Sequence, residues 1–149
     1  MVTIRDLAEA DRAAVLELSD RLTIGVAAWR DPVAVAAVVR GWLEDSTAAD
    51  FVGAALIAEA AGRVVGFVSV DTVTHFAGEV DAYVGELVVD AAYEGRGVGA
   101  ALVAAAERVA CERGHRCLTL STGAANDRAI SFYESLGFDA EDVKLTKVL

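Results

Sequence analysis

The sequence predicts a mixed α/β fold in which a meander of antiparallel strands is followed by a strand–helix–strand crossover. Two β-prone runs flank an Ala-Gly turn at residues 61–62, and a third long apolar run follows them. An amphipathic helix then leads into a short strand, as in a crossover unit. With 149 residues, of which 55% are hydrophobic and 24% charged, the chain can bury a core, and we expect a single domain over residues 1–149.

The first third of the chain is expected to hold a short strand and two helices. Residues 2–5 are β-prone, and residues 7–22 carry apolar side chains at helical spacing with acidic residues early in the run. Asp31 followed by Pro32 is typical of a helix start, because aspartate caps free N–H groups and proline fits the first turn. This second helix should end near Glu44. Its apolar residues fall on one side, which we expect to pack on the core: Val35, Val38, Val39 and Trp42.

The remaining elements follow from apolar runs and their boundaries. Strands are expected at residues 54–59, 63–74, 79–89, 117–121 and 144–149, and helices at residues 97–114 and 126–136. Helix 97–114 is the clearest, because its apolar residues recur at helical spacing and Gly114 can end it. Asn126 can cap the last helix, which we expect to stop at Gly137.

Composition narrows the classes of partner. The formal net charge is −10, whereas nucleic acids and anionic membranes require clustered basic residues, so we expect neither as a partner. The two cysteines, Cys111 and Cys117, exclude a disulfide framework and lack the paired spacing of a zinc site, so no metal is expected. The chain shows no signal peptide and no apolar run of about 18 residues, so we expect a cytoplasmic protein.

The most informative segment runs from Gly85 to Ala100, where a strand enters a turn with alternate glycines and continues directly as a helix. Glycine permits positive φ and the close approach of a ligand, and the first N–H groups of a helix lack internal partners. The segment therefore predicts a cradle for phosphate or pyrophosphate. The alternative is a tight turn that only needs small residues.

Known classes of phosphate cradle differ in the residues around their glycines. A P-loop is excluded, because it needs a lysine after its last glycine and none is present. Gly95, Gly97 and Ala100 fit the spacing of a dinucleotide-binding turn, but the next strand ends in residues 119–121 without the acidic residue that this fold uses. The antiparallel strands upstream also fit that fold poorly. It stays as an alternative that predicts binding of a nicotinamide nucleotide.

Two motifs point to another class. Glu94-Gly95-Arg96-Gly97-Val98-Gly99 resembles the Gln/Arg-x-x-Gly-x-Gly/Ala motif of the GCN5-related N-acetyltransferases, with Glu94 where the family has glutamine or arginine. The segment from Asn126 to Phe138 resembles the later family motif Asn-x-x-Ala-x-x-x-Tyr-x-x-x-Gly-Phe, and one helix and one strand separate the two motifs, as in the family. The resemblance implies a central, mostly antiparallel sheet with a splayed parallel strand pair and helices on both faces.

The resemblance also implies that acetyl-CoA binds where strands 79–89 and 117–121 splay apart. Backbone groups of Leu87, Val88 and Val89 would pair with the pantetheine arm, and the amide of Leu87 or Val88 would hold the developing oxyanion. Asn126 would contact the cofactor arm. The pyrophosphate would be held by the backbone of Glu94, Gly95, Arg96, Gly97, Val98, Gly99 and Ala100.

Two residues are candidates for proton transfer. Tyr133 matches the family's usual general acid, which protonates the departing CoA thiolate. The ordinary tyrosine pKa of about 10 is close enough to that of a thiol for proton transfer as the C–S bond breaks. The attacking amine must be neutral, and Glu86 is the candidate base, because strand alternation places it on the same face as Val84 and Val88. The alternatives are a tyrosine that only packs on the core and a carboxylate that only faces an edge or caps a turn.

Together these residues predict an acetyl-CoA-dependent N-acetyltransferase that acts on a primary amine by direct attack in a ternary complex. The acidic chain favours a cationic small molecule as acceptor, with a peptide amine as the other option, and the apolar segment 143–149 could contribute to a homodimer. The alternative function is a non-catalytic acyl-CoA-binding or regulatory domain. Further candidates for the acceptor side, each of which could equally be an ordinary core or surface residue, are His75, Trp29, Trp42, Asp71, Glu79 and Asp81.

Overall fold

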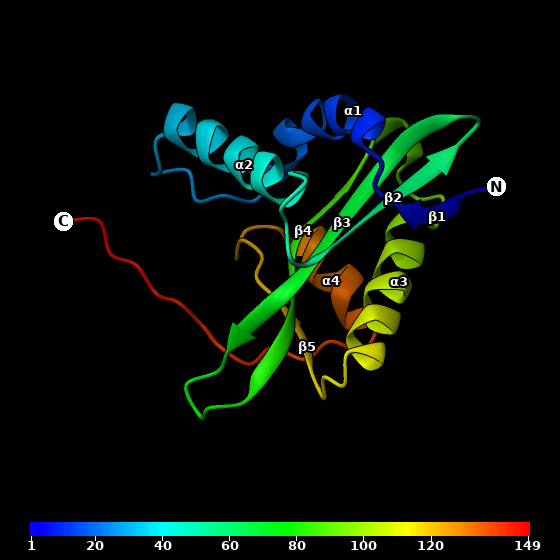
Figure 1. Cartoon of the computed structure of the whole chain (residues 1–149). Coiled ribbons are helices and arrows are strands. Elements are labelled where there is room, and N and C mark those ends of the chain that lie inside the picture. The colour runs from blue at the N-terminus through cyan, green and yellow to red at the C-terminus, as the bar shows by residue number, and fades with distance from the viewer.

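A five-stranded sheet forms the frame of the structure, a computed structural model that describes residues 1–149 (Figure 1). Its strands lie side by side in chain order: β1 (Thr3–Asp6), β2 (Ala54–Ala60), β3 (Arg63–Thr74), β4 (Val80–Val89) and β5 (Leu118–Leu120). Neighbouring strands from β1 to β4 are antiparallel, whereas β4 and β5 are parallel. The predicted mixed α/β fold with one parallel strand pair is confirmed.

Helices cover both faces of this sheet, with α1 and α2 on one side and α3 on the other (Figure 1). The helices are α1 (Arg12–Leu16), α2 (Pro32–Ser46), α3 (Val98–Glu112) and α4 (Asp127–Ser135), and short 3-10 turns lie at η1 (Glu9–Asp11), η2 (Ser19–Thr23) and η3 (Ala91–Tyr93). Leu102 and its apolar neighbours on α3 join a core of 13 buried residues with one face of the sheet. Val15 of α1 and Leu43 of α2 pack on the other face against Phe67. None of the helices combines the length and the apolar composition that a membrane span requires.

The local signals at helix starts and at the hairpin are confirmed. The Asp31 carboxylate accepts a hydrogen bond from the Val33 N–H at 3.0 Å and so caps α2. The side-chain oxygen Oδ1 of Asn126 accepts a hydrogen bond from the Ala129 N–H at 3.2 Å and so caps α4. Both residues of the turn at 61–62 have positive φ, as the tight turn between β2 and β3 requires.

Two predicted elements are wrong. The helix expected over residues 7–22 is broken into η1, a five-residue α1 and η2, and the Thr23 hydroxyl donates to the Asp20 carbonyl at 2.7 Å within η2. Such local side-chain hydrogen bonds replace those of a continuous helix. The strand expected over residues 144–149 does not form, because this segment pairs with no strand, and the chain after α4 leaves the fold (Figure 1).

The packing side of α2 differs from the expected one. Val39 and Leu43 are 3% and 0% exposed, whereas Val38 and Trp42 are both 51% exposed. The buried stripe therefore follows the i, i+4 row that contains Val39 and Leu43, and it leaves Trp42 on the surface. The prediction that Trp42 packs in the core is wrong.

A bulge in β4 changes which side chains share a face. Ser69 of β3 stands opposite two residues of β4, Gly85 and Glu86, so the register shifts at this point. Val84, which precedes the bulge, packs in the core under α3, whereas Val88, which follows it, packs in the core under α1 and α2. The expectation that Glu86 shares a face with both Val84 and Val88 is therefore wrong, because simple alternation stops at the bulge.

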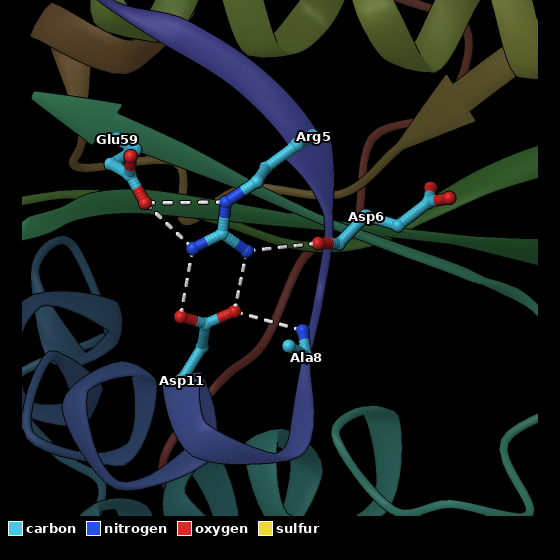
Figure 2. A network of polar contacts seen from close by, with 5 residues as sticks. All are labelled: Arg5, Asp6, Ala8, Asp11 and Glu59. Atoms are coloured by element: carbon cyan, nitrogen blue, oxygen red, sulfur yellow. Dashed lines mark hydrogen bonds and ion pairs between the residues drawn. The ribbon is translucent and has the colours of Figure 1, made fainter. Parts of the chain in front are cut away.

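An arginine holds β1, β2 and η1 together, as Figure 2 shows. The Arg5 guanidinium donates to both oxygens of Asp11, at 2.7 and 3.0 Å, and to the Glu59 carboxylate at 2.7 and 3.2 Å. Asp11 also accepts from the Ala8 N–H at 2.8 Å. The hydrogen bonds from Arg5 lower the pKa of Asp11 below its usual range, and they act against the opposing effect of its burial.

The Asp11 ion pair predicts a pH dependence of stability. Because the folded-state pKa of Asp11 is lowered, its contribution is complete above the ordinary aspartate pKa and is lost as pH falls through the lower folded value. The urea midpoint of the wild type should therefore fall as pH is reduced below about 4. In Asp11→Asn the midpoint should be lower at neutral pH and should fall less in acid. Glu9→Gln, an exposed neighbour without a partner, should follow the wild type, and an Asp11→Asn curve parallel to the wild type would contradict the assignment.

Candidate functional site

Strands β4 and β5 are paired over only part of β4. Leu118–Leu120 lie opposite residues 82–84 of β4, and β5 ends there, whereas β4 continues to Val89. The edge of β4 that faces β5 is therefore without a strand partner after Val84. The resemblance implies a splayed pair, and the structure has the feature on which ligand binding there depends, an edge of β4 left open beyond the paired residues.

Hydrogen bonds show which backbone groups line this open edge. The N–H of Glu86 donates to the Ser69 hydroxyl at 3.0 Å, and the N–H of Asp90 donates to the Val65 carbonyl at 2.9 Å, so both point toward β3. Because backbone groups alternate in direction along a strand, those of Leu87 and Val89 point to the open edge. An extended ligand could pair with them as an added strand.

The turn between β4 and α3 has the geometry of an anion cradle. Gly95 and Gly97 have φ of 71° and 80°, and a Cβ added at either would meet no atom within 4 Å, so the space above the turn is open. The N–H groups of residues 95–100 find no acceptor in the protein, because α3 begins only at Val98. Free N–H groups and the helix dipole together favour a phosphate here.

Glu94, at the start of this turn, is paired with arginines from two distant elements. Arg21 of η2 forms an ion pair with one oxygen of the Glu94 carboxylate, and Arg128 of α4 binds the other at 2.9 Å. Arg21 also donates from Nε to the Val89 carbonyl at 3.3 Å, so it lies along the open edge of β4. Sequence reasoning missed both arginines. The only available signal was the acidic residue at a position where the family motif has glutamine or arginine.

The remaining cradle residue, Arg96, lies over the Tyr93 ring at 5.0 Å from its centroid. Gly99 is close to Phe132 of α4, since an added Cβ would lie 3.1 Å from its ring. The structure therefore brings α4, which carries Tyr133, against the first turn of α3. Position 99 needs glycine for this close approach rather than for its backbone angle.

Asn126 lies where two loops meet. Besides capping α4, its side-chain amide donates to the Ile24 carbonyl at 3.4 Å. Gly25 and Gly123 pack against this junction, and a side chain at Gly123 would overlap the Gly25 backbone. The segment after η2 therefore contacts the loop between β5 and α4, and Asn126 is held between them.

Glu86 is a buried carboxylate on the face of the sheet that α2 covers. It is 7% exposed, and the Ser69 hydroxyl donates to it. Burial raises the pKa of Glu86 above the usual carboxyl range and the nearby charge of Asp45 adds to this, whereas the hydrogen bond from Ser69 and the nearby Ser46 hydroxyl oppose it. A carboxylate with a raised pKa is better suited to accept a proton near neutral pH.

Tyr133 lies among aromatic rings on α4. Its ring centroid is 5.2 Å from that of Phe132 and 5.6 Å, edge-on, from that of Phe138. Burial raises the pKa of Tyr133 above its usual value, so its hydroxyl keeps its proton at neutral pH. No hydrogen bond links Tyr133 to Glu86.

The other candidate residues have separate positions. The Nε2 atom of His75 lies 3.1 Å from a carboxylate oxygen of Glu141, and its Nδ1 accepts a hydrogen bond from the Ala77 N–H at 3.0 Å. Trp29 is 56% exposed, so both tryptophans of the segment before and within α2 are on the surface. Glu79 and Asp81 do lie close together, at the end of β4 away from the cradle.

A parallel strand pair that splays beside a glycine cradle is the arrangement of an acetyltransferase fold, as the two motifs also imply. The chain belongs to the acetyltransferase (GNAT) family, whose family model matches residues 12–138. The dinucleotide-binding alternative is wrong, since antiparallel neighbours make up most of the sheet.

Comparisons with known proteins agree with this family. An N-acetyltransferase of Methanocaldococcus jannaschii, described as uncharacterized, is 37% identical over 89 residues, which are 58% of this chain and 39% of that relative. The match thus spans about two fifths of the relative. A GCN5-related N-acetyltransferase from Ralstonia eutropha JMP134 has a TM-score of 0.74 at 23% identity, covering 100% of this chain and 99% of the other. The structure of AAC(6')-Iy with the bisubstrate analogue CoA-S-monomethyl-acetylneamine has a TM-score of 0.70 at 22% identity, covering 100% and 99%.

Proposed function

We propose that residues 1–149 form a single N-acetyltransferase domain that moves an acetyl group from acetyl-CoA to a primary amine. The observation that carries this proposal is the row of free N–H groups at residues 95–100, which continues the open edge of β4. An elongated ligand with a pyrophosphate at one end fits both features. The CoA-linked analogue bound to AAC(6')-Iy, a protein of the same fold, supports this ligand class.

The backbone would position the two ends of acetyl-CoA. N–H groups of the turn from Glu94 to Ala100 would hold the pyrophosphate, with Asn126 beside the arm. Leu87 and Val89 would pair with the pantetheine, because their groups face the open edge, whereas those of Val88 are directed to β3. The Leu87 N–H would therefore donate to the thioester oxygen as negative charge develops on it.

Proton transfer would use the buried Glu86 and the half-buried Tyr133. Glu86, directly or through water, would take a proton from the attacking ammonium, so that the neutral nitrogen forms the new C–N bond. As the C–S bond breaks, Tyr133 would protonate the CoA sulfur. No covalent enzyme intermediate is required, and the two cysteines lie elsewhere, with Cys111 exposed on α3 and Cys117 just before β5.

The acceptor proposed here is a cationic small molecule, with a peptide amine as the other option. The net charge of −10 favours approach of a cation. Trp29 and Trp42 are exposed and available to contact an acceptor scaffold. We also propose that the exposed apolar segment 143–149 contributes to a homodimer, and that the protein is cytoplasmic.

Substitution of Gly97 tests the cradle. Gly97→Ala should lose about 1 kcal/mol of stability from the positive φ, and its acetyl-CoA affinity should fall about tenfold or more, because the new methyl group occupies the open cradle. Gly114→Ala is a matched control, since Gly114 has φ of 78° and equally open space at the other end of α3. Isothermal calorimetry should show the affinity loss only in Gly97→Ala. Equal loss in both variants, or a rise in wild-type Tm with NAD rather than acetyl-CoA, would contradict the cradle.

Replacement of Glu86 tests the general base. Glu86→Gln should lower kcat/KM at neutral pH by about 10²- to 10⁴-fold while acetyl-CoA still binds. In the wild type, kcat/KM should rise with pH through the raised pKa of Glu86, since only the carboxylate accepts a proton. Asp45→Asn should move this limb to lower pH, because the Asp45 charge helps to raise that pKa. If kcat/KM of Glu86→Gln rises with pH as in the wild type, the general base must be another group.

Replacement of Tyr133 tests the general acid. Tyr133→Phe keeps the ring and its aromatic contacts but removes the proton donor, so kcat should fall about 100-fold or more with little change in the acetyl-CoA dissociation constant. Release of free CoA thiol gives the rate. Normal turnover in Tyr133→Phe would exclude the role. Tight acetyl-CoA binding by the wild type without thiol release across a broad amine panel would instead indicate the non-catalytic acyl-CoA-binding alternative.

A further inference from the structure

A group of potential metal ligands lies at the end of β4 opposite to the cradle. Glu79 directly precedes β4, Asp81 is within it, and Cys117 directly precedes β5. One ligand atom from each of these side chains lies within 4.8 Å of the other two. The parallel pairing of β4 and β5 produces this group, because the Ala82 N–H donates to the Cys117 carbonyl at 3.0 Å and brings the starts of both strands together.

An independent feature of Asp81 points to a missing partner. The residue is 6% exposed, and its Oδ1 is the only buried side-chain nitrogen or oxygen atom in the structure without a hydrogen-bond partner. A buried carboxylate oxygen without a donor or a cation is costly, and native structures contain few of them. Two of the groups close to the Asp81 side chain are the Cys117 thiol and the Glu79 carboxylate, and neither carries a positive charge. The nearby Arg116 guanidinium donates its hydrogen bonds to Glu79 and not to Asp81 Oδ1.

We propose that Glu79, Asp81 and Cys117 bind a divalent transition-metal cation of the zinc type. A thiolate among the ligands excludes magnesium and calcium, which take oxygen ligands, and favours zinc, which accepts sulfur and carboxylate oxygen together. Ligand atoms around tetrahedral zinc lie about 3.5 Å apart, given metal–ligand bonds of about 2.0 to 2.3 Å. The present separations of up to 4.8 Å exceed this spacing by about 1.3 Å at most, so the three ligand atoms would move closer together when the cation binds.

The surroundings of the group fit such a cation. Glu79 and Cys117 are only partly buried, so a cation can enter from solvent and keep a water as its fourth ligand. Two carboxylates and a thiolate exceed the charge of a divalent ion by one, and Arg116, paired with Glu79 at 2.6 and 2.7 Å, supplies the balancing positive charge. Sequence reasoning expected no zinc site, because it looked for closely spaced cysteines. The ligands come instead from the starts of two paired strands.

The position of this site indicates a structural role. Asp81 and Leu87, whose N–H would hold the thioester oxygen, are separated along β4 by about 20 Å at the usual rise per residue, so the cation would not contact the acetyl group. It would cross-link β4 and β5 where they are paired, next to the point where they separate. The cation would thus fix the closed end of the splayed pair.

Metal binding by the purified chain tests the site. After removal of metals by chelation, Zn²⁺ should bind with a stoichiometry of one per chain in calorimetry and should raise Tm. Co²⁺ in its place should give a thiolate-to-metal charge-transfer band. Cys117→Ser and Asp81→Asn should each weaken Zn²⁺ binding about 100-fold or more, because even the loss of an outer partner of a metal site costs about 10- to 100-fold. Cys111→Ser, which alters the exposed cysteine on α3, should bind as the wild type does.

The outcomes are distinct from one another. Asp81→Asn should keep or raise the Tm of the metal-free protein, because the substitution removes a buried charge without a partner. This result, together with weaker Zn²⁺ binding, would show that Asp81 is a metal ligand and not a residue that only stabilises the fold. If Asp81→Asn does not fold, the cobalt spectrum and Cys117→Ser still decide. No Zn²⁺ binding by the wild type, a cobalt spectrum without the thiolate band, or unchanged binding in Cys117→Ser would each overturn the proposal. Gly97→Ala should bind Zn²⁺ normally, since the cradle is at the other end of β4.

Discussion

Strand β4 has two residues between Val84 and Leu87, whereas β3 has one residue, Ser69, between their partners. The extra residue of β4 reverses the direction of the side chains and backbone groups that follow it. Before the bulge, backbone groups of β4 pair with β5 and the side chain of Val84 enters the core under α3. After it, Leu87 and Val89 direct their backbone groups to an edge with no strand. A register shift of one residue exchanges the two faces of a strand, so the bulge decides both what the edge can bind and where Glu86 points.

Ser69 holds this irregularity in place. Its hydroxyl accepts from the Glu86 N–H and donates to the Glu86 carboxylate, and the two residues are 2% and 7% exposed. Each group satisfies the other in a region that excludes water. Loss of either partner would leave a buried polar group unsatisfied, at a cost of about 1 to 3 kcal/mol. The same burial that makes this pair necessary also raises the pKa of Glu86.

The sequence predicted well those features that depend on a few consecutive residues. The helix caps at Asp31 and Asn126 and the positive φ of Gly95 and Gly97 are confirmed, because each is determined by local backbone chemistry. The face of Glu86 was mispredicted, since a bulge is a property of two strands and not of one. The failure over residues 144–149 has a related cause, because a strand forms only together with a pairing partner, and the local β-propensity of these residues did not decide whether they would pair with one.

Contacts between distant segments were not accessible to sequence reasoning. The exposed position of Trp42 depends on the rotation of α2 against the sheet, which the apolar pattern did not determine. The pairing of Glu94 with Arg21 and Arg128 joins η2, the cradle and α4, and nothing local in the sequence specifies it. The fold was thus predicted at the level of its elements, whereas the charges around the candidate site required the tertiary structure.

The position of Arg21 has a consequence for the way in which a cofactor arm would meet the open edge of β4. Without ligand, Arg21 spans from the Val89 carbonyl to Glu94, so it occupies hydrogen-bonding groups that a cofactor arm would need. An arm that pairs with the Val89 carbonyl would displace only the Nε hydrogen bond of Arg21, whereas the ion pair with Glu94 uses another nitrogen of the same guanidinium. The arginine could therefore turn away from the strand while it stays anchored at the cradle, so that one side chain serves as a retractable substitute for the ligand.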